Sequence, residues 1–114
     1  MKTLADVELR ENDRLAVMAA AEILRRDFPV ERVILFGSKV RGDDDAESDI
    51  DLLLLTSHPV DHAMRRRMTH TVFDLQLSHD VVLSMMIVPS ADWETGVYRI
   101  LPIREEVDRE GVAA

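Results

Sequence analysis

The fold of this chain is decided by residues 33–55, which hold two apolar runs separated by a polar loop. The first run and its turn read Val33-Ile34-Leu35-Phe36-Gly37-Ser38, and the second run reads Asp49-Ile50-Asp51-Leu52-Leu53-Leu54-Leu55. Apolar runs of about four to eight residues bounded by Gly, Ser and Asp indicate buried β-strands. We therefore predict two strands, with a Gly-Ser turn after the first and two carboxylates opening the second.

Helical and strand patterns on both sides complete a small domain. The run Leu52-Leu53-Leu54-Leu55 is apolar on both faces, which is typical of a central strand covered by helices on each side. We expect Asn12 or Asp13 to cap the first helix and Gly111 to form a left-handed cap after the last. Hydrophobic periodicity and breaker residues predict helices over 12–27, 60–77 and 102–109, a short helix after Pro89, and strands over 30–36, 49–56 and 80–88. This order predicts one α/β (α+β) domain over residues 1–114, a mixed sheet flanked by helices.

Composition excludes several classes of protein. The 114 residues carry a net charge of −8, which argues against nucleic acid as the direct substrate, because that affinity rests on Lys and Arg. There is no cysteine, so neither a disulfide framework nor a thiolate metal site can form. Asp6 and Glu8 lie in the first eight residues, where a signal peptide would be apolar, and no apolar run approaches the roughly 18 residues of a membrane span. We expect a cytoplasmic protein.

Asp49 and Asp51 are the candidate metal ligands. Residues two apart on a strand share a face, with Cα atoms roughly 6.6 Å apart. Two carboxylates on one face suit Mg²⁺, which prefers carboxylate and phosphate oxygens together with water. An Asp-x-Asp pattern by itself is weak evidence for a metal site. The alternative is that the two aspartates simply lie in solvent at the start of a strand.

The Gly-Ser turn strengthens that interpretation. A glycine directly after a buried strand lets backbone approach a ligand closely, and the Ser38 amide and hydroxyl can then face an anion such as a triphosphate. Arg41 can reach a phosphate as a fork of donors. The stretch lacks both Gly-x-Gly-x-x-Gly and the Gly-Lys-Ser/Thr of a P-loop. A calcium loop starting at Asp43 fails as well, because its sixth position is Ser48 rather than Gly. The acidic residues 43–47 are expected to be a solvated spacer.

These residues together resemble a known family. Phe36-Gly37-Ser38-Lys39-Val40-Arg41-Gly42, followed by Ser48-Asp49-Ile50-Asp51-Leu52, is similar to the signature of minimal nucleotidyltransferases of the DNA polymerase β-like superfamily. The resemblance covers roughly residues 12–112 and extends weakly to the tail.

The resemblance implies an enzyme and its substrates. Asp49 and Asp51 would be catalytic and would hold Mg²⁺, and a nucleoside triphosphate, ATP by expectation, would rest on Gly37, Ser38 and Arg41. A nucleoside monophosphate, AMP if ATP is used, would pass to an acceptor hydroxyl with release of pyrophosphate. Many members of the family are antitoxins paired with a HEPN-type ribonuclease, so a HEPN-type partner is implied. Whether the chain forms a homo-oligomer is left open.

One departure from the family divides the functional hypotheses. The superfamily places a third carboxylate on a neighbouring strand, where this chain offers Ser84, with Asp80 as the alternative if the strand is shifted. If Ser84 holds the position, one metal ligand is missing. The chain is then either an active nucleotidyltransferase or a weak or inactive nucleotidyltransferase-like antitoxin that neutralises its partner by contact. Arg65-Arg66-Arg67 offers a contact to a nucleotide tail or an acidic partner, but a run of charges on a helix is usually a solvated face, and that interpretation is favoured.

Overall fold

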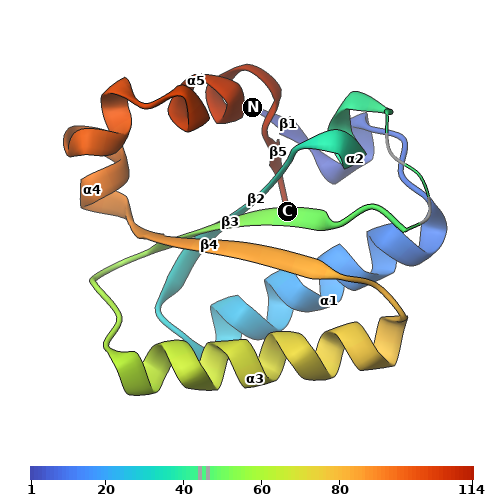
Figure 1. Cartoon of the computed structure of the whole chain (residues 1–114), viewed down its shortest axis with the longest axis horizontal. Coiled ribbons are helices and arrows are strands. Elements are labelled where there is room, and N and C mark those ends of the chain that lie inside the picture. Colours follow the sequence, from blue (N-terminus) through green and yellow to red (C-terminus); the bar gives the residue numbers. More distant parts are fainter. Residues whose placement is uncertain (44, 46) are drawn as a thin grey trace.

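The computed structural model describes residues 1–43, 45 and 47–114, and within them helices pack on both faces of one sheet (Figure 1). Asp44 and Ala46 of the predicted acidic spacer lie outside the described residues, and its other members, Asp43, Asp45 and Glu47, are exposed. In chain order the elements are β1 (Lys2–Thr3), η1 (Leu4–Asp6), α1 (Glu11–Asp27), β2 (Val30–Phe36), α2 (Ser38–Arg41), β3 (Ile50–Thr56), α3 (His62–His79), β4 (Leu83–Pro89), α4 (Ser90–Thr95), η2 (Val97–Ile100), α5 (Pro102–Glu110) and β5 (Val112–Ala113).

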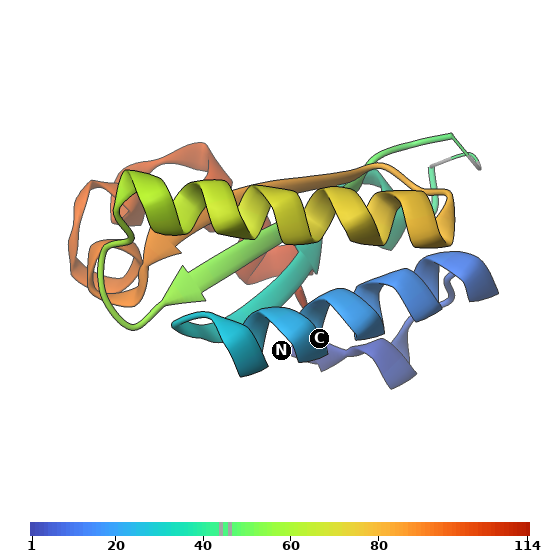
Figure 2. The same ribbon diagram turned by 90° about the horizontal axis from the view of Figure 1, so that it is seen from below.

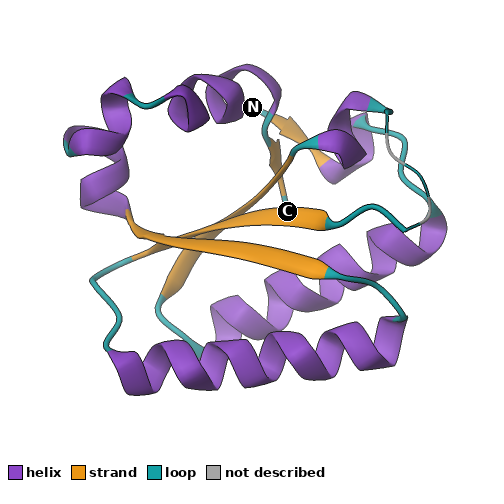
Figure 3. Cartoon of the chain, in the orientation of Figure 1, coloured by secondary structure: helices purple, strands orange, loops and turns teal. Residues whose placement is uncertain are grey.

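The sheet is mixed, with the strand order β1-β5-β2-β3-β4. The two predicted strands β2 and β3 pair antiparallel, and β4 runs parallel to β3 because α3 carries the chain back across the sheet. The prediction of a mixed α/β sheet flanked by helices is confirmed, and Figure 3 shows its strands between the helices.

β3 is central because both of its faces are covered. Leu52 and Leu54 pack into the core against α1 and α3, whereas Leu53 and Leu55 pack into a second core with Trp93 of α4. All four leucines are at most 1% exposed. The apolar run therefore has the buried, helix-covered setting that its pattern predicts.

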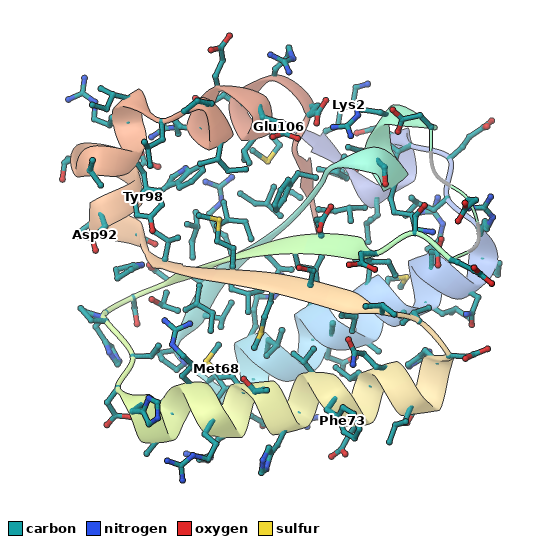
Figure 4. The ribbon with its side chains drawn as sticks, viewed as in Figure 1. Lys2, Met68, Phe73, Asp92, Tyr98 and Glu106 are labelled. Atoms are coloured by element: carbon teal, nitrogen blue, oxygen red, sulfur yellow. The ribbon has the colours of Figure 1, made fainter. Side chains whose placement is uncertain are left out.

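The long helices α1 and α3 lie side by side under one face of the sheet (Figure 2). In Figure 4, Met68 points from α3 towards the sheet, whereas Phe73 points away from it. Met68 is fully buried and Phe73 is 54% exposed, so one side of α3 supplies the core. Among the described residues, no helix is long and apolar enough to cross a membrane.

The predicted cap of the first helix is wrong, and the predicted cap of the last helix has another conformation. The cap of α1 is Arg10; Asn12 instead donates to the carbonyl of His79, and Asp13 is buried. Gly111 does cap α5, with its amide donating to the Val107 carbonyl, but its backbone is extended, φ −61°, rather than left-handed. A Cβ at Gly111 would lie 2.5 Å from the Val107 carbonyl oxygen, so close packing requires this glycine. Sequence reasoning missed β1 and β5, because two-residue strands carry too little pattern to detect.

Candidate active site

The Gly-Ser turn joins the end of β2 to the start of α2. Gly37 has φ +86° and ψ −157°, a conformation that residues with a Cβ rarely adopt. Its carbonyl accepts from the Val40 and Arg41 amides. The amide of Ser38, at the first position of α2, has no acceptor within the helix. The turn thus directly follows the strand, as the sequence predicted, and Ser38 begins a short helix.

Asp51 lies directly against this glycine. β2 and β3 place Phe36 opposite Asp51, so the turn after Phe36 meets the opening of β3. A Cβ on Gly37 would stand 2.3 Å from Asp51 Oδ2. The carboxylate therefore occupies the space that any other residue at position 37 would fill. This contact joins the two halves of the predicted site, which lie 14 residues apart in the chain.

Negative charge gathers around Asp51. Burial raises the pKa of the Asp51 carboxyl, the charges of Asp49 and Glu106 raise it further, and the Arg41 guanidinium opposes them. Asp49 immediately precedes β3, which begins at Ile50 rather than at the predicted Asp49. Like charges held together favour a bound cation or a retained proton. The pair of carboxylates thus has the electrostatics of a cation site.

Arg41 is held by acidic side chains. Its guanidinium donates to Glu106 Oε1 at 3.2 Å and Glu110 Oε1 at 2.9 Å, both on α5, and lies 3.4 Å from Asp43 Oδ2. Figure 4 shows Glu106 on the side of α5 towards α2. The predicted phosphate ligand is therefore close to Asp51 but engaged by α5.

A serine lies on the strand where the family resemblance implies a third carboxylate. Ser84 on β4 is in register with Asp51 on the parallel neighbour β3, so their side chains emerge on the same face of the sheet. Asp80 does not lie on a strand, because β4 begins at Leu83 rather than at residue 80. It caps α3 in a left-handed conformation, φ 53°. The alternative with Asp80 on the strand is wrong.

Two carboxylates remain for a metal. Across residues 1–43, 45 and 47–114, the structure shows no group of three or more His, Cys, Asp or Glu side chains placed to hold a metal ion. Mg²⁺ commonly uses one or two protein carboxylates and completes its shell with water and substrate phosphates. Asp49 and Asp51, with the glycine that makes room for one of them, fit that mode of binding.

Two depressions flank this region. One, of about 380 Å³, is lined by Asp13, Glu47, Ser48, Asp80, Val81 and Val82. The other, of about 330 Å³, is lined by Glu8, Leu9, Arg10, Asp13, Lys39 and Gly42. They border the turn and the loop that carry the candidate residues, and Asp13 lines both.

Residues 17–107 match the family model described as "Nucleotidyltransferase domain". The chain belongs to this nucleotidyltransferase family. The match contains the Gly-Ser turn and both carboxylates, so the resemblance drawn from residues 36–52 is confirmed at the level of the family.

Relatives and solved structures agree with this assignment. A Methanocaldococcus jannaschii protein named "Putative protein adenylyltransferase" is 36% identical over 58 residues, 51% of this chain and 59% of that protein. The match thus spans about three fifths of the relative. A toxin-antitoxin crystal structure with AMP-PNP superposes with a TM-score of 0.58 at 18% identity, covering 91% of this chain and 72% of that chain. A crystal structure of the toxin-antitoxin MntA-HepT superposes with a TM-score of 0.54 at 18% identity, and the match covers 88% of this chain and 69% of that chain. At these identities the structures show the nucleotidyltransferase fold alone.

Sequence reasoning missed two residues near this candidate site. Glu106 reaches Arg41 from the last helix, and nothing in its local pattern marks it. Lys39 lies inside the quoted motif, but no role was predicted for it from the sequence. A buried lysine is uncommon, but burial is not readable from the motif.

Proposed function

We propose that this chain is a Mg²⁺-dependent nucleotidyltransferase that transfers AMP from ATP to an acceptor hydroxyl. The observation that supports this most is the contact between Gly37 and Asp51. This contact brings together the turn proposed to bind phosphate and one of the two proposed metal ligands. The proposal treats residues 1–114 as one domain.

Each residue has a distinct role in the proposed site. Asp49 and Asp51 hold the metal, and bound Mg²⁺ would neutralise charge that develops on the phosphates during transfer. The backbone of Gly37 admits a phosphate closely, and the Ser38 amide and hydroxyl donate to its oxygens. Arg41 exchanges its contact with Glu106 for a phosphate, which it can bind through two donors.

The proposed acceptor is a hydroxyl on a partner toxin, of the HEPN type that the family resemblance implies. Support comes from the names of related proteins: one is called a protein adenylyltransferase, and the solved structures include toxin-antitoxin pairs. The charge of −8 also suits a protein acceptor better than a nucleic acid.

The test is transfer of label from α-labelled ATP to the co-expressed protein of the neighbouring gene. We expect Mg²⁺-dependent labelling of that protein and loss of label with Asp49→Asn/Asp51→Asn. Asp92→Asn/Asp108→Asn, on α4 and α5, serves as the matched control for removal of two acids and is expected to label normally. Equal labelling by native and Asp49→Asn/Asp51→Asn protein would reject the assigned site.

A second candidate is an inactive subunit that neutralises its partner by contact. The observation that favours it is Ser84 opposite Asp51, where the family has a third carboxylate. This candidate predicts that Asp49→Asn/Asp51→Asn neutralises the partner as well as native protein does. A folded variant that binds the partner without neutralising it would reject contact alone.

A further inference from the structure

Lys39 is buried beside the proposed phosphate-binding turn. Its side chain is 1% exposed, and its Nζ lies 2.8 Å from Oδ2 of Asp13, whose side chain is 7% exposed. Lysine is almost never fully buried unless it is paired. The pair crosses between α2, which Ser38 begins, and α1, so it fixes the short helix on a long one.

The same ammonium also reaches the loop before β3. Lys39 Nζ donates to the Asp45 carbonyl oxygen at 3.0 Å. Asp45 in turn organises the loop: its side chain accepts from the Glu47 amide at 2.8 Å, and its carbonyl accepts from the Ser48 amide at 3.2 Å. Asp49 follows directly. One buried charge thus connects α1, the phosphate-binding turn and the approach to Asp49.

We propose that Lys39 is a positioning residue that holds the Gly37-Ser38 turn and the Asp49 carboxylate in a fixed spatial relation. The proposal rests on the nucleotidyltransferase function proposed above. Lys39 is not assigned to the phosphates, because its ammonium faces Asp13 and the Asp45 carbonyl inside the protein. It acts on the nucleotide through the residues that it orders.

Lys39 can position the loop because its ammonium donates directed hydrogen bonds, which an apolar side chain cannot do. Apolar residues of similar volume often replace a buried ion pair with no loss of stability. They cannot donate to a loop carbonyl, so they would fill the space and leave the loop unattached. Stability and positioning can therefore be separated by substitution.

The decisive variant is Asp13→Leu/Lys39→Met, which removes both charges and fills the space they occupied. Arg104→Met is the matched control, because Arg104 donates to the Trp93 carbonyl and pairs with Asp108 far along the chain from this loop. Native and variant proteins are compared by urea unfolding, by titration with Mg²⁺ and AMP-PNP, and by hydrogen exchange of the Glu47 and Ser48 amides.

We expect the double variant to unfold at a urea concentration close to native. Its affinity for AMP-PNP should fall at least tenfold, and its Glu47 and Ser48 amides should exchange at least tenfold faster. Arg104→Met should leave both amides unchanged. If the Glu47 and Ser48 amides of the double variant exchanged at the same rate as in native protein, the proposal would be overturned. Hydrogen exchange needs no nucleotide, so it tests the positioning even if native protein binds no AMP-PNP, a result that would reject the proposed function instead.

Discussion

Replacing Gly37 with alanine tests the contact on which the proposed site depends. The added Cβ would stand 2.3 Å from Asp51 Oδ2, about 0.7 Å inside the 3.0 Å that real Cβ contacts respect. The nearest atom is a side-chain oxygen, so the Asp51 carboxylate must rotate or the turn must shift. We expect Gly37→Ala to move Asp51 away from the position in which it shares a cation with Asp49.

The cost of the substitution has two parts that the chain allows to be separated. Holding alanine at φ +86° costs on the order of 1–3 kcal/mol of stability. Gly42 supplies the control: its φ is +79°, but a Cβ there meets nothing within 4 Å. Gly42→Ala therefore carries backbone strain of about 1–2 kcal/mol without the clash.

The assay combines urea unfolding with titration of Mg²⁺ and AMP-PNP. We expect both variants to be destabilised, but only Gly37→Ala to lose affinity, by at least about tenfold, which corresponds to about 1.4 kcal/mol. If Gly37→Ala bound AMP-PNP as tightly as Gly42→Ala, the contact between the turn and Asp51 would have no part in binding. The reasoning that joins the two motifs would then be refuted.

Three further predictions concern the acids around the site. Ser84→Asp adds a carboxylate on the strand beside Asp51, so the rate of label transfer from ATP should rise on the order of tenfold. An unchanged rate would count against the idea that the native site lacks a metal ligand. The raised pKa of Asp51 means that the folded chain keeps this proton to higher pH than the unfolded chain, so stability falls as pH rises above about 4. Asp51→Asn in EDTA should therefore melt higher than native at pH 7 and equally near pH 3, as differential scanning calorimetry would show. Glu106→Gln removes one of the partly exposed ion pairs of Arg41, so urea unfolding should show that the free energy of unfolding falls by about 0–1 kcal/mol. AMP-PNP should bind more tightly, because Arg41 then has one acidic partner fewer. Weaker binding would contradict the role given to Arg41.

Local patterns predicted the central elements well. Val30–Phe36 has the predicted bounds, and Ile50–Thr56 begins one residue later than expected. These strands are buried on both faces, so their runs are continuously apolar and end at Gly, Ser or Asp. The third strand was extended too far, because Val81 and Val82 continue the apolar run although the strand begins at Leu83. Asn12 donates to the His79 carbonyl, 67 residues along the chain, and such a contact is not a local property, which is why the cap of α1 was mistaken.

What the sequence determined alone is the family motif: a glycine and serine after one apolar strand, and two aspartates opening the next. Their chemistry is set by residue type and spacing, so it is readable without coordinates. Only the tertiary structure decided which groups surround them. Pairing of β2 with β3 brings Gly37 against Asp51, pairing of β3 with β4 sets Ser84 beside it, and packing of α5 brings Glu106 to Arg41. These contacts join residues from 14 to 65 positions apart, and such distances depend on the register and packing of the whole chain.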